Sequence, residues 1–235
     1  MRRSDATQDV TRSSIVPTPP RHARHVRPRM GQGPREKRLG HGYRKIAPTP
    51  ACARLADVLT DRLHVLTGGP GSGKTTLIAA LAAAGIRTSR EVGRQVIREQ
   101  VAAGGTALPW ADEMAFAEAM WPREVAAQQQ ALATGGTVVL DRGAPDVVGF
   151  LRLSGLPVPT HIDAAARTIR YNPRVFLAPF WAEIYAHDAE RKQPPEIAAA
   201  TEALMRSTYA DYGYTLVELP RASVAERVRF VLDRL

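Results

Sequence analysis

From about residue 51 onward, short apolar runs alternate with longer stretches of helical composition. The apolar runs predict buried strands at residues 63–67, 137–141, 174–178 and 215–219, with a further short strand at 86–90. The intervening stretches predict helices over 74–84, 91–103, 112–134, 145–153, 163–171, 196–211 and 223–235. This alternation is typical of βαβ units, so we expect an α/β fold, a five-stranded parallel sheet with helices on both faces.

Residues 1–50 have a different pattern. They contain no apolar run longer than two residues, seven prolines, and 12 Lys and Arg against 3 Asp and Glu. Such a segment cannot bury a core, so we expect a disordered basic head followed by one domain over 51–235. The head holds the whole excess charge of +9, which leaves the predicted domain neutral. Polybasic segments bind nucleic acid and anionic surfaces, so weak contact of this kind is one interpretation of the head. The other is an upstream extension without a structured role.

The sequence GGPGSGKT lies between the first predicted strand and the helix that follows it. It satisfies the phosphate-binding pattern G-x-x-x-x-G-K-[ST] in the context that this pattern requires. Glycine is needed because backbone N–H groups must converge on phosphate oxygens, which demands positive φ and leaves no room for Cβ atoms. We expect Lys74 to reach the β- and γ-phosphates and the Thr75 hydroxyl to bind Mg²⁺. The candidate nucleotide-binding residues are Gly68, Gly69, Pro70, Gly71, Ser72, Gly73, Lys74, Thr75 and Thr76.

Charged residues follow two of the other predicted strands. Asp141 ends the strand 137–141, where a second ligand of Mg²⁺ is expected, and Arg142 places a cation beside the transferring phosphoryl group. An ordinary helix N-cap is the alternative role of Asp141. Glu91 follows the short strand at 86–90 and is a candidate acceptor for the proton of a substrate hydroxyl. Its alternative role is a first-turn glutamate that pairs with Arg94.

A polar stretch bounded by prolines, residues 179–194, precedes the sixth predicted helix. With most of that helix it forms a predicted lid over about 179–209. Arg191 and Lys192 are the candidates to close over a nucleotide and neutralise charge in the transition state. The alternative is a solvated, charged surface.

The segments LTGGPGSGKTTL, REVGRQVI, VVLDRGAPD and AERKQPPE together resemble the AAA-type predicted ATPases related to the kinase domain that phosphorylates nicotinamide riboside. These belong to the wider group of P-loop nucleoside and nucleotide kinases, and the resemblance covers about residues 60–235. It implies a P-loop NTPase with the sheet order 2-3-1-4-5 and a small helical lid. It also implies that Lys74 and Thr75 contact phosphate and Mg²⁺, and that Asp141 and Arg142 form an acidic and basic pair after the third strand. By the same resemblance Arg191 and Lys192 are lid cations, and Glu91 is the acidic group that ends the second strand.

These features predict an enzyme that binds Mg-ATP and transfers a phosphoryl group to a small hydroxyl-bearing metabolite. The alternative is a nucleotide-dependent ATPase or switch that acts on a protein or membrane partner. No adenine-specific motif is present, so GTP stays open beside ATP. No segment approaches the roughly 18 apolar residues of a membrane span. A single cysteine, Cys52, allows no intrachain disulfide, and we therefore expect a cytoplasmic protein.

Overall fold

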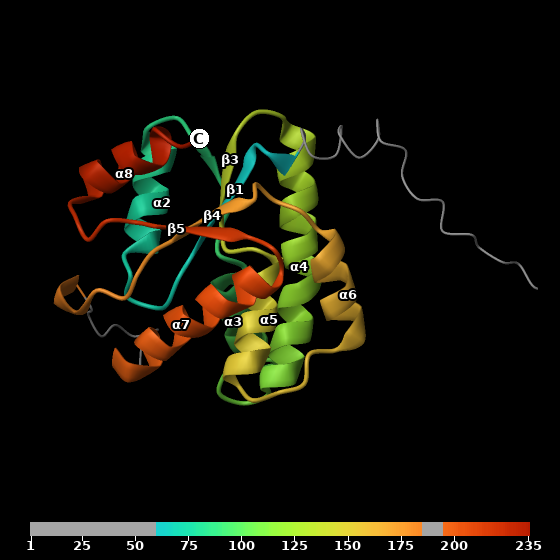
Figure 1. Cartoon of the computed structure of the whole chain (residues 1–235). Helices are drawn as coiled ribbons and strands as arrows, with labels where there is room; N and C mark the ends of the chain where they lie inside the picture. The colour runs from blue at the N-terminus through green and yellow to red at the C-terminus, as the bar shows by residue number, and fades with distance from the viewer. Residues whose placement is uncertain (1–59, 185–194) are drawn as a thin grey trace, which may run out of the picture. The chain divides into compact units, whose positions relative to one another are not determined.

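The computed structural model describes residues 60–184 and 195–235 (Figure 1). Its strands form one parallel sheet in the order β2-β3-β1-β4-β5. Their bounds are β1 Leu63–Thr67, β2 Arg87–Thr88, β3 Val138–Asp141, β4 Arg174–Leu177 and β5 Thr215–Glu218. The predicted α/β class and sheet order are confirmed. The basic head lies outside the described residues, so its expected partners stay predictions.

Helices connect the strands, and their bounds follow the sequence pattern to within a few residues. They are α2 Lys74–Ala83, α3 Val92–Ala103, α4 Glu113–Thr134, α5 Ala144–Leu153, α6 Thr160–Thr168, the 3₁₀ turn η1 Ala182–Ile184, α7 Pro195–Asp211 and α8 Val224–Leu232. The largest difference is α6, which begins three residues before the predicted start and ends at Thr168. Pro159 is the N-cap residue, and its extended ψ of 138° places it just outside the helix, so α6 begins at Thr160. None of the described helices is both long and apolar enough to cross a bilayer.

The strands bury apolar side chains on both faces of the sheet. Successive side chains point to opposite faces, so Leu63 and Val65 of β1 join one core while Leu66 joins the other. Helices α3 to α7 contribute to the first core, and α2 and α8 cover the second (Figure 1). All five strands run in the same direction, so their carboxyl ends meet at one edge of the sheet. The phosphate loop and the Asp141–Arg142 pair therefore reach the same edge.

Candidate active site

The phosphate loop, residues 68–75, leaves β1 and leads directly into α2. Positive φ angles occur at Gly68 (136°) and Gly73 (77°), where side chains would be strained. A Cβ atom at Gly68 would lie 2.2 Å from the carbonyl oxygen of Ala178, just beyond β4. One at Gly69 would lie 2.5 Å from the carbonyl oxygen of Ala198 in α7. Backbone angle therefore requires glycine at both ends of the loop, and close packing also requires it at Gly68 and Gly69.

Lys74 lies inside this loop, with only 6% of its surface exposed. Its ammonium group donates to loop oxygens alone: 2.7 Å to Gly68 O, 2.6 Å to Gly69 O and 3.1 Å to Ser72 Oγ. Burial and the neighbouring Arg142 cation lower the pKa of Lys74 to about 7. Neutral oxygens satisfy this ammonium less well than an anion, so its position favours a phosphate ligand.

Arg142 links the loop to the carboxylates around it. Its φ of 78° lies in the left-handed region, which costs a non-glycine residue about 1–3 kcal/mol. Its guanidinium donates to Glu91 Oε1 at 3.1 Å, Asp146 Oδ1 at 2.9 Å and Gly68 O at 3.3 Å. Burial opposes the charge, but the Glu91 and Asp146 carboxylates outweigh it and raise the pKa of Arg142. The side chain is thus a permanent cation whose position is fixed from three sides.

Asp146 is the buried acceptor that holds this arrangement together. Its carboxylate accepts from Thr67 Oγ1 at 2.7 Å, Arg142 Nη1 at 2.9 Å, the Gly143 backbone N–H at 3.1 Å and Tyr209 Oη at 2.5 Å. These donors come from β1, the turn after β3 and α7. Sequence reasoning gave Asp146 no role. Its place in the first turn of α5 resembles an ordinary helix-start acid, and only the tertiary fold brings Thr67 and Tyr209 to it.

Asp141 lies beside this network but is incompletely bonded. Its backbone N–H donates to Ser89 Oγ at 2.9 Å, whereas its buried Oδ1 has no partner in the part of the chain that the structure describes. Burial and the nearby Glu91 carboxylate raise the pKa of Asp141 to about 6. A buried oxygen without a donor normally has a ligand or an ion to complete it. The side chain is therefore available to a cation.

Glu91, the N-cap residue of α3, has the opposite character. Arg94 Nε pairs with Glu91 Oε2 at 2.7 Å, which is the expected i,i+3 ion pair, and Arg142 holds the other oxygen. Burial alone would raise the pKa of Glu91, but the Arg142 and Lys74 cations outweigh it and lower the pKa to about 2. Glu91 is a fixed carboxylate that can accept a hydrogen bond but is a weak base.

Glu124 of α4 is a second residue that the sequence analysis missed. It lies one turn after Met120 and Trp121 on the buried side of the helix, and only 3% of its surface is exposed. No residue in 60–184 or 195–235 donates a hydrogen bond to its carboxyl group. Burial and the Asp146 carboxylate raise the pKa of Glu124 to about 8. A glutamate on a mostly apolar helix face was the available signal, because a buried carboxyl group is costly unless it has a partner or a ligand.

The fold thus gathers the predicted Lys74, Glu91, Asp141 and Arg142 at one edge of the sheet, where each affects the pKa of others. Thr75 and Thr76 lie at the exposed start of α2, directly after Lys74. The predicted lid cations Arg191 and Lys192 lie outside the described residues. Of the lid, the η1 turn and α7 are described.

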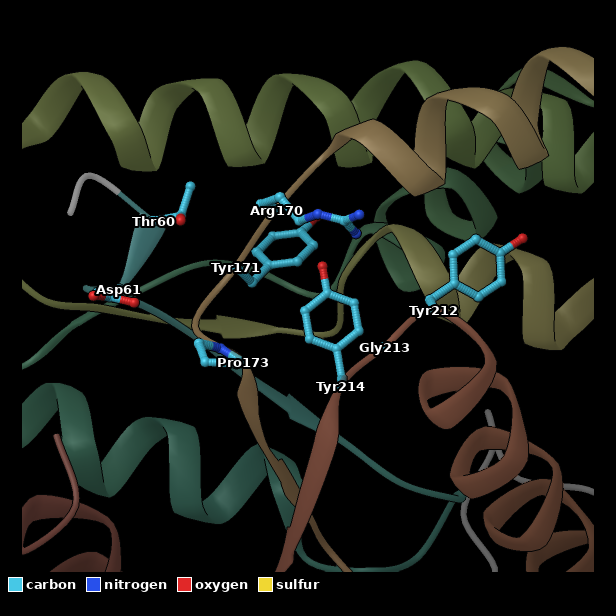
Figure 2. A pocket seen from close by; sticks show the side chains of 8 residues that line it. All are labelled: Thr60, Asp61, Arg170, Tyr171, Pro173, Tyr212, Gly213 and Tyr214. Atoms are coloured by element: carbon cyan, nitrogen blue, oxygen red, sulfur yellow. The ribbon is translucent and has the colours of Figure 1, made fainter. Parts of the chain in front are cut away.

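A cavity of about 370 Å³ lies elsewhere, at the amino ends of β1, β4 and β5 (Figure 2). Figure 2 shows tyrosine rings on its wall, and its full lining is Thr60, Asp61, Arg170, Tyr171, Pro173, Tyr212, Gly213 and Tyr214. None of the predicted site residues lines it. Because the phosphate loop follows the carboxyl end of β1, this cavity and the loop belong to opposite edges of the sheet.

Comparison with protein families settles the class of the chain. The sequence pattern of a family described as an AAA domain matches residues 63–227, from the first residue of β1 into α8. The chain belongs to this AAA domain family. Its phosphate loop and sheet order are those of a P-loop NTPase. A search of curated proteins gives no match.

Solved structures similar to this AAA domain protein have the same fold. One is the NadR protein in complex with NR, with a TM-score of 0.57 and 18% sequence identity. It aligns with 77% of this chain and 52% of the NadR chain, so the present chain spans about half of that protein. Another is deoxyadenosine kinase from M. mycoides with the products dCMP and dCDP, with a TM-score of 0.53 and 13% identity, covering 73% of this chain and 97% of that one. At sequence identities this low, these structural similarities establish a shared fold and nothing more.

Proposed function

We propose that this protein is a phosphotransferase that uses a magnesium-bound nucleoside triphosphate as donor and a small hydroxyl-bearing metabolite as acceptor. The observation that carries the proposal is that three groups lie together: the buried Lys74 in the phosphate loop, the fixed Arg142 and the unsatisfied carboxylate of Asp141. Arg142 contacts both the loop and Glu91, and Asp141 lies at the end of the neighbouring strand. Phosphoryl transfer depends on positioning and charge stabilisation more than on covalent chemistry, and these groups supply both.

The residues present fit a magnesium ion. Asp141 has a buried oxygen without a partner, and the Thr75 hydroxyl lies at the exposed start of α2. Carboxylate and hydroxyl oxygens are suitable ligands for Mg²⁺, which usually keeps several waters and is completed by substrate phosphates. Thr75 and Asp141 would hold the ion, and it would neutralise charge on the phosphates when bound. This fit also favours the cation-binding role of Asp141 over that of an ordinary helix cap.

Each charged side chain then has a separate task. Lys74 exchanges its loop oxygens for phosphate oxygens, because an anion is the stronger acceptor. Arg142, held by Glu91 and Asp146, supplies a fixed positive charge beside the phosphoryl group. Glu91 accepts a hydrogen bond from the acceptor hydroxyl and orients it. A loose phosphoryl-transfer transition state needs an oriented hydroxyl more than it needs a strong base.

The acceptor is proposed to lie between Glu91 and Glu124. The carboxyl group of Glu124 has no hydrogen-bond donor among the described residues, yet it lies close enough to Asp146 and Arg142 for their charges to affect its pKa. An unused, buried hydrogen-bonding group next to the reacting groups is what a polar metabolite needs for orientation. The similar structures include a deoxyadenosine kinase and a protein in complex with NR, so deoxyadenosine and NR are reasonable first acceptors to test.

A direct test is to incubate the full chain with Mg-ATP or Mg-GTP and a panel of hydroxyl metabolites that includes deoxynucleosides and NR. We expect at least one compound to accelerate nucleotide consumption and to appear as its phosphate monoester by mass spectrometry. The Lys74→Ala variant should give neither signal. Nucleotide consumption that no metabolite or extract fraction accelerates would contradict the proposal and favour the switch alternative.

A further inference from the structure

The nucleoside side of the phosphate loop carries a cation that the proposed chemistry does not use. Arg227 lies in the first turn of α8, and only 3% of its surface is exposed. Its Nη1 donates to Ser72 O at 3.0 Å, while its buried Nε has no partner in the part of the chain that the structure describes. None of the carboxylates described in the fold pairs with it, and burial lowers the pKa of Arg227. A buried guanidinium with open donors is costly unless a ligand completes it.

Ser72 separates Arg227 from Lys74. The Ser72 hydroxyl accepts from Lys74 at 3.1 Å, whereas its carbonyl accepts from Arg227. A Cβ atom at Gly73 would lie 2.7 Å from Arg227 Nη1, so glycine at this position leaves the space that the guanidinium fills. Lys74 marks the interior of the loop, where phosphates bind. Arg227 therefore lies on the opposite side of the loop backbone from Lys74.

The direction of a bound nucleotide follows from the charged groups. Lys74, Arg142 and Asp141 identify the end at which the γ-phosphate is transferred, toward β3. Helix α8 packs beside α2 on the opposite face of the sheet from α3 and α5 (Figure 1). The nucleoside must leave the loop away from the transferring end, which is the side that Arg227 occupies. A base on that side would face Arg227, whereas the γ-phosphate would not.

We propose that Arg227 recognises the purine base of the nucleotide and favours guanine over adenine. Arginine presents donors only, in a planar fork. Guanine offers two acceptors side by side, N7 and O6, whereas adenine offers N7 beside an amino donor. The unpartnered Nε and the rest of the fork match the guanine edge and oppose the adenine amino group. This inference rests on the nucleotide binding of the proposed function and names the base that it prefers.

The test is isothermal titration of the full chain with GTP, ATP and inorganic tripolyphosphate, each with Mg²⁺. The parent protein should bind GTP about tenfold more tightly than ATP. Arg227→Met should lose this preference and leave tripolyphosphate binding unchanged, which also shows that the loop remains folded. Arg227→Lys keeps the charge without the fork and should behave like Arg227→Met. The matched control is Arg229→Met, an exposed arginine two residues along the same helix, which should behave like the parent.

Three results would overturn the inference. Equal affinity of the parent for GTP and ATP would show that no guanine edge is recognised. Loss of tripolyphosphate binding together with GTP binding in Arg227→Met would show that Arg227 only holds the shape of the loop. A guanine preference that survives in Arg227→Lys would show that charge alone acts. If Lys74→Ala abolishes binding of all three compounds while Arg227→Met changes none, the proposed function stands and this inference alone fails. If the parent binds none of them, both fall.

Discussion

The proposed nucleotide side and the proposed acceptor side of the site are built from different parts of the chain. On the nucleotide side, one continuous segment supplies backbone groups, and Lys74 is satisfied by oxygens of its own loop. On the acceptor side, single side chains from α3, α4, β3 and α5 meet across the fold. Loop geometry therefore specifies the first side, whereas the second depends on the correct packing of several helices.

The acceptor side also divides into satisfied and unsatisfied groups. Asp146 and Glu91 each accept from several donors and hold Arg142 in place, and Glu91 keeps lone pairs for the proposed acceptor hydroxyl. Asp141 has a buried oxygen without a partner, Glu124 accepts no hydrogen bond from the described residues, and the pKa of each is raised. Ionisable groups with perturbed pKa values gather at functional sites, so the unsatisfied pair marks where ligands bind. The satisfied pair is the support that positions them.

The largest expected effect comes from removing Lys74, the cation inside the phosphate loop. Lys74→Ala should lower kcat/KM of phosphoryl transfer by about 10³-fold, because the loop loses its contact to the β- and γ-phosphates. The sheet and its two cores do not depend on this side chain, so the circular dichroism spectrum should be unchanged. A variant that binds the magnesium nucleotide as tightly as the parent would contradict the role given to the loop.

The next effect tests the support on the acceptor side. Asp146→Asn replaces an acceptor of four hydrogen bonds by a group that must itself donate, so it should lower the free energy of unfolding by about 3 kcal/mol. It should also slow phosphoryl transfer, since Arg142 loses one of its fixed partners. Denaturant unfolding measures the first quantity. The matched control is Tyr209→Phe, which removes a single donor and should cost about 1 kcal/mol. Equal losses in both variants would show that Asp146 is not the centre of the network.

Asp141→Asn should separate activity from stability. Activity should fall about 100-fold, because the variant lacks the proposed magnesium ligand. Stability should increase by about 2 kcal/mol above pH 6, since the parent must ionise a buried carboxyl whose pKa is raised to about 6. A raised carboxyl pKa destabilises the folded state progressively as the pH rises from about 4 to 6. The stability difference between variant and parent should therefore grow over that interval and then level off. A difference independent of pH would refute the assignment.

The smallest effect lies under the nucleotide side, in the core covered by α2 and α8. His64 is buried, neither ring nitrogen has a partner among the described residues, and burial lowers its pKa to about 4. Protonation of the unfolded chain below pH 6.5 then opposes folding, so the stability due to this group is lost as the pH falls toward 4. We expect a loss of about 1–2 kcal/mol between pH 7 and pH 5, which His64→Leu should abolish. Identical pH profiles of parent and variant would show that His64 is not the sensitive group.

The two sides also differ in how much of each the sequence predicts. The phosphate loop, the strands and the helix positions could be predicted because each depends on local spacing, and the sheet order followed from the family resemblance. Asp146 could not be assigned, since it meets Thr67 and Tyr209 only after β1 and α7 pack together, whereas Glu124 had a signal in its place on a mostly apolar helix face. Arg227 was missed for the same reason: it is 155 residues from Ser72 in the chain. Long-range side-chain contacts leave no periodic signal in a single sequence.

The central claim is that this AAA domain protein transfers a γ-phosphate to the hydroxyl of a small molecule. Phosphorus NMR of the full chain with a magnesium nucleotide and a metabolite extract tests it most directly. We predict a growing phosphate monoester resonance that matches the loss of the γ-phosphate signal, with little inorganic phosphate, and neither change with Lys74→Ala. Inorganic phosphate as the sole product, or monoester formation that persists in Lys74→Ala, would contradict the account.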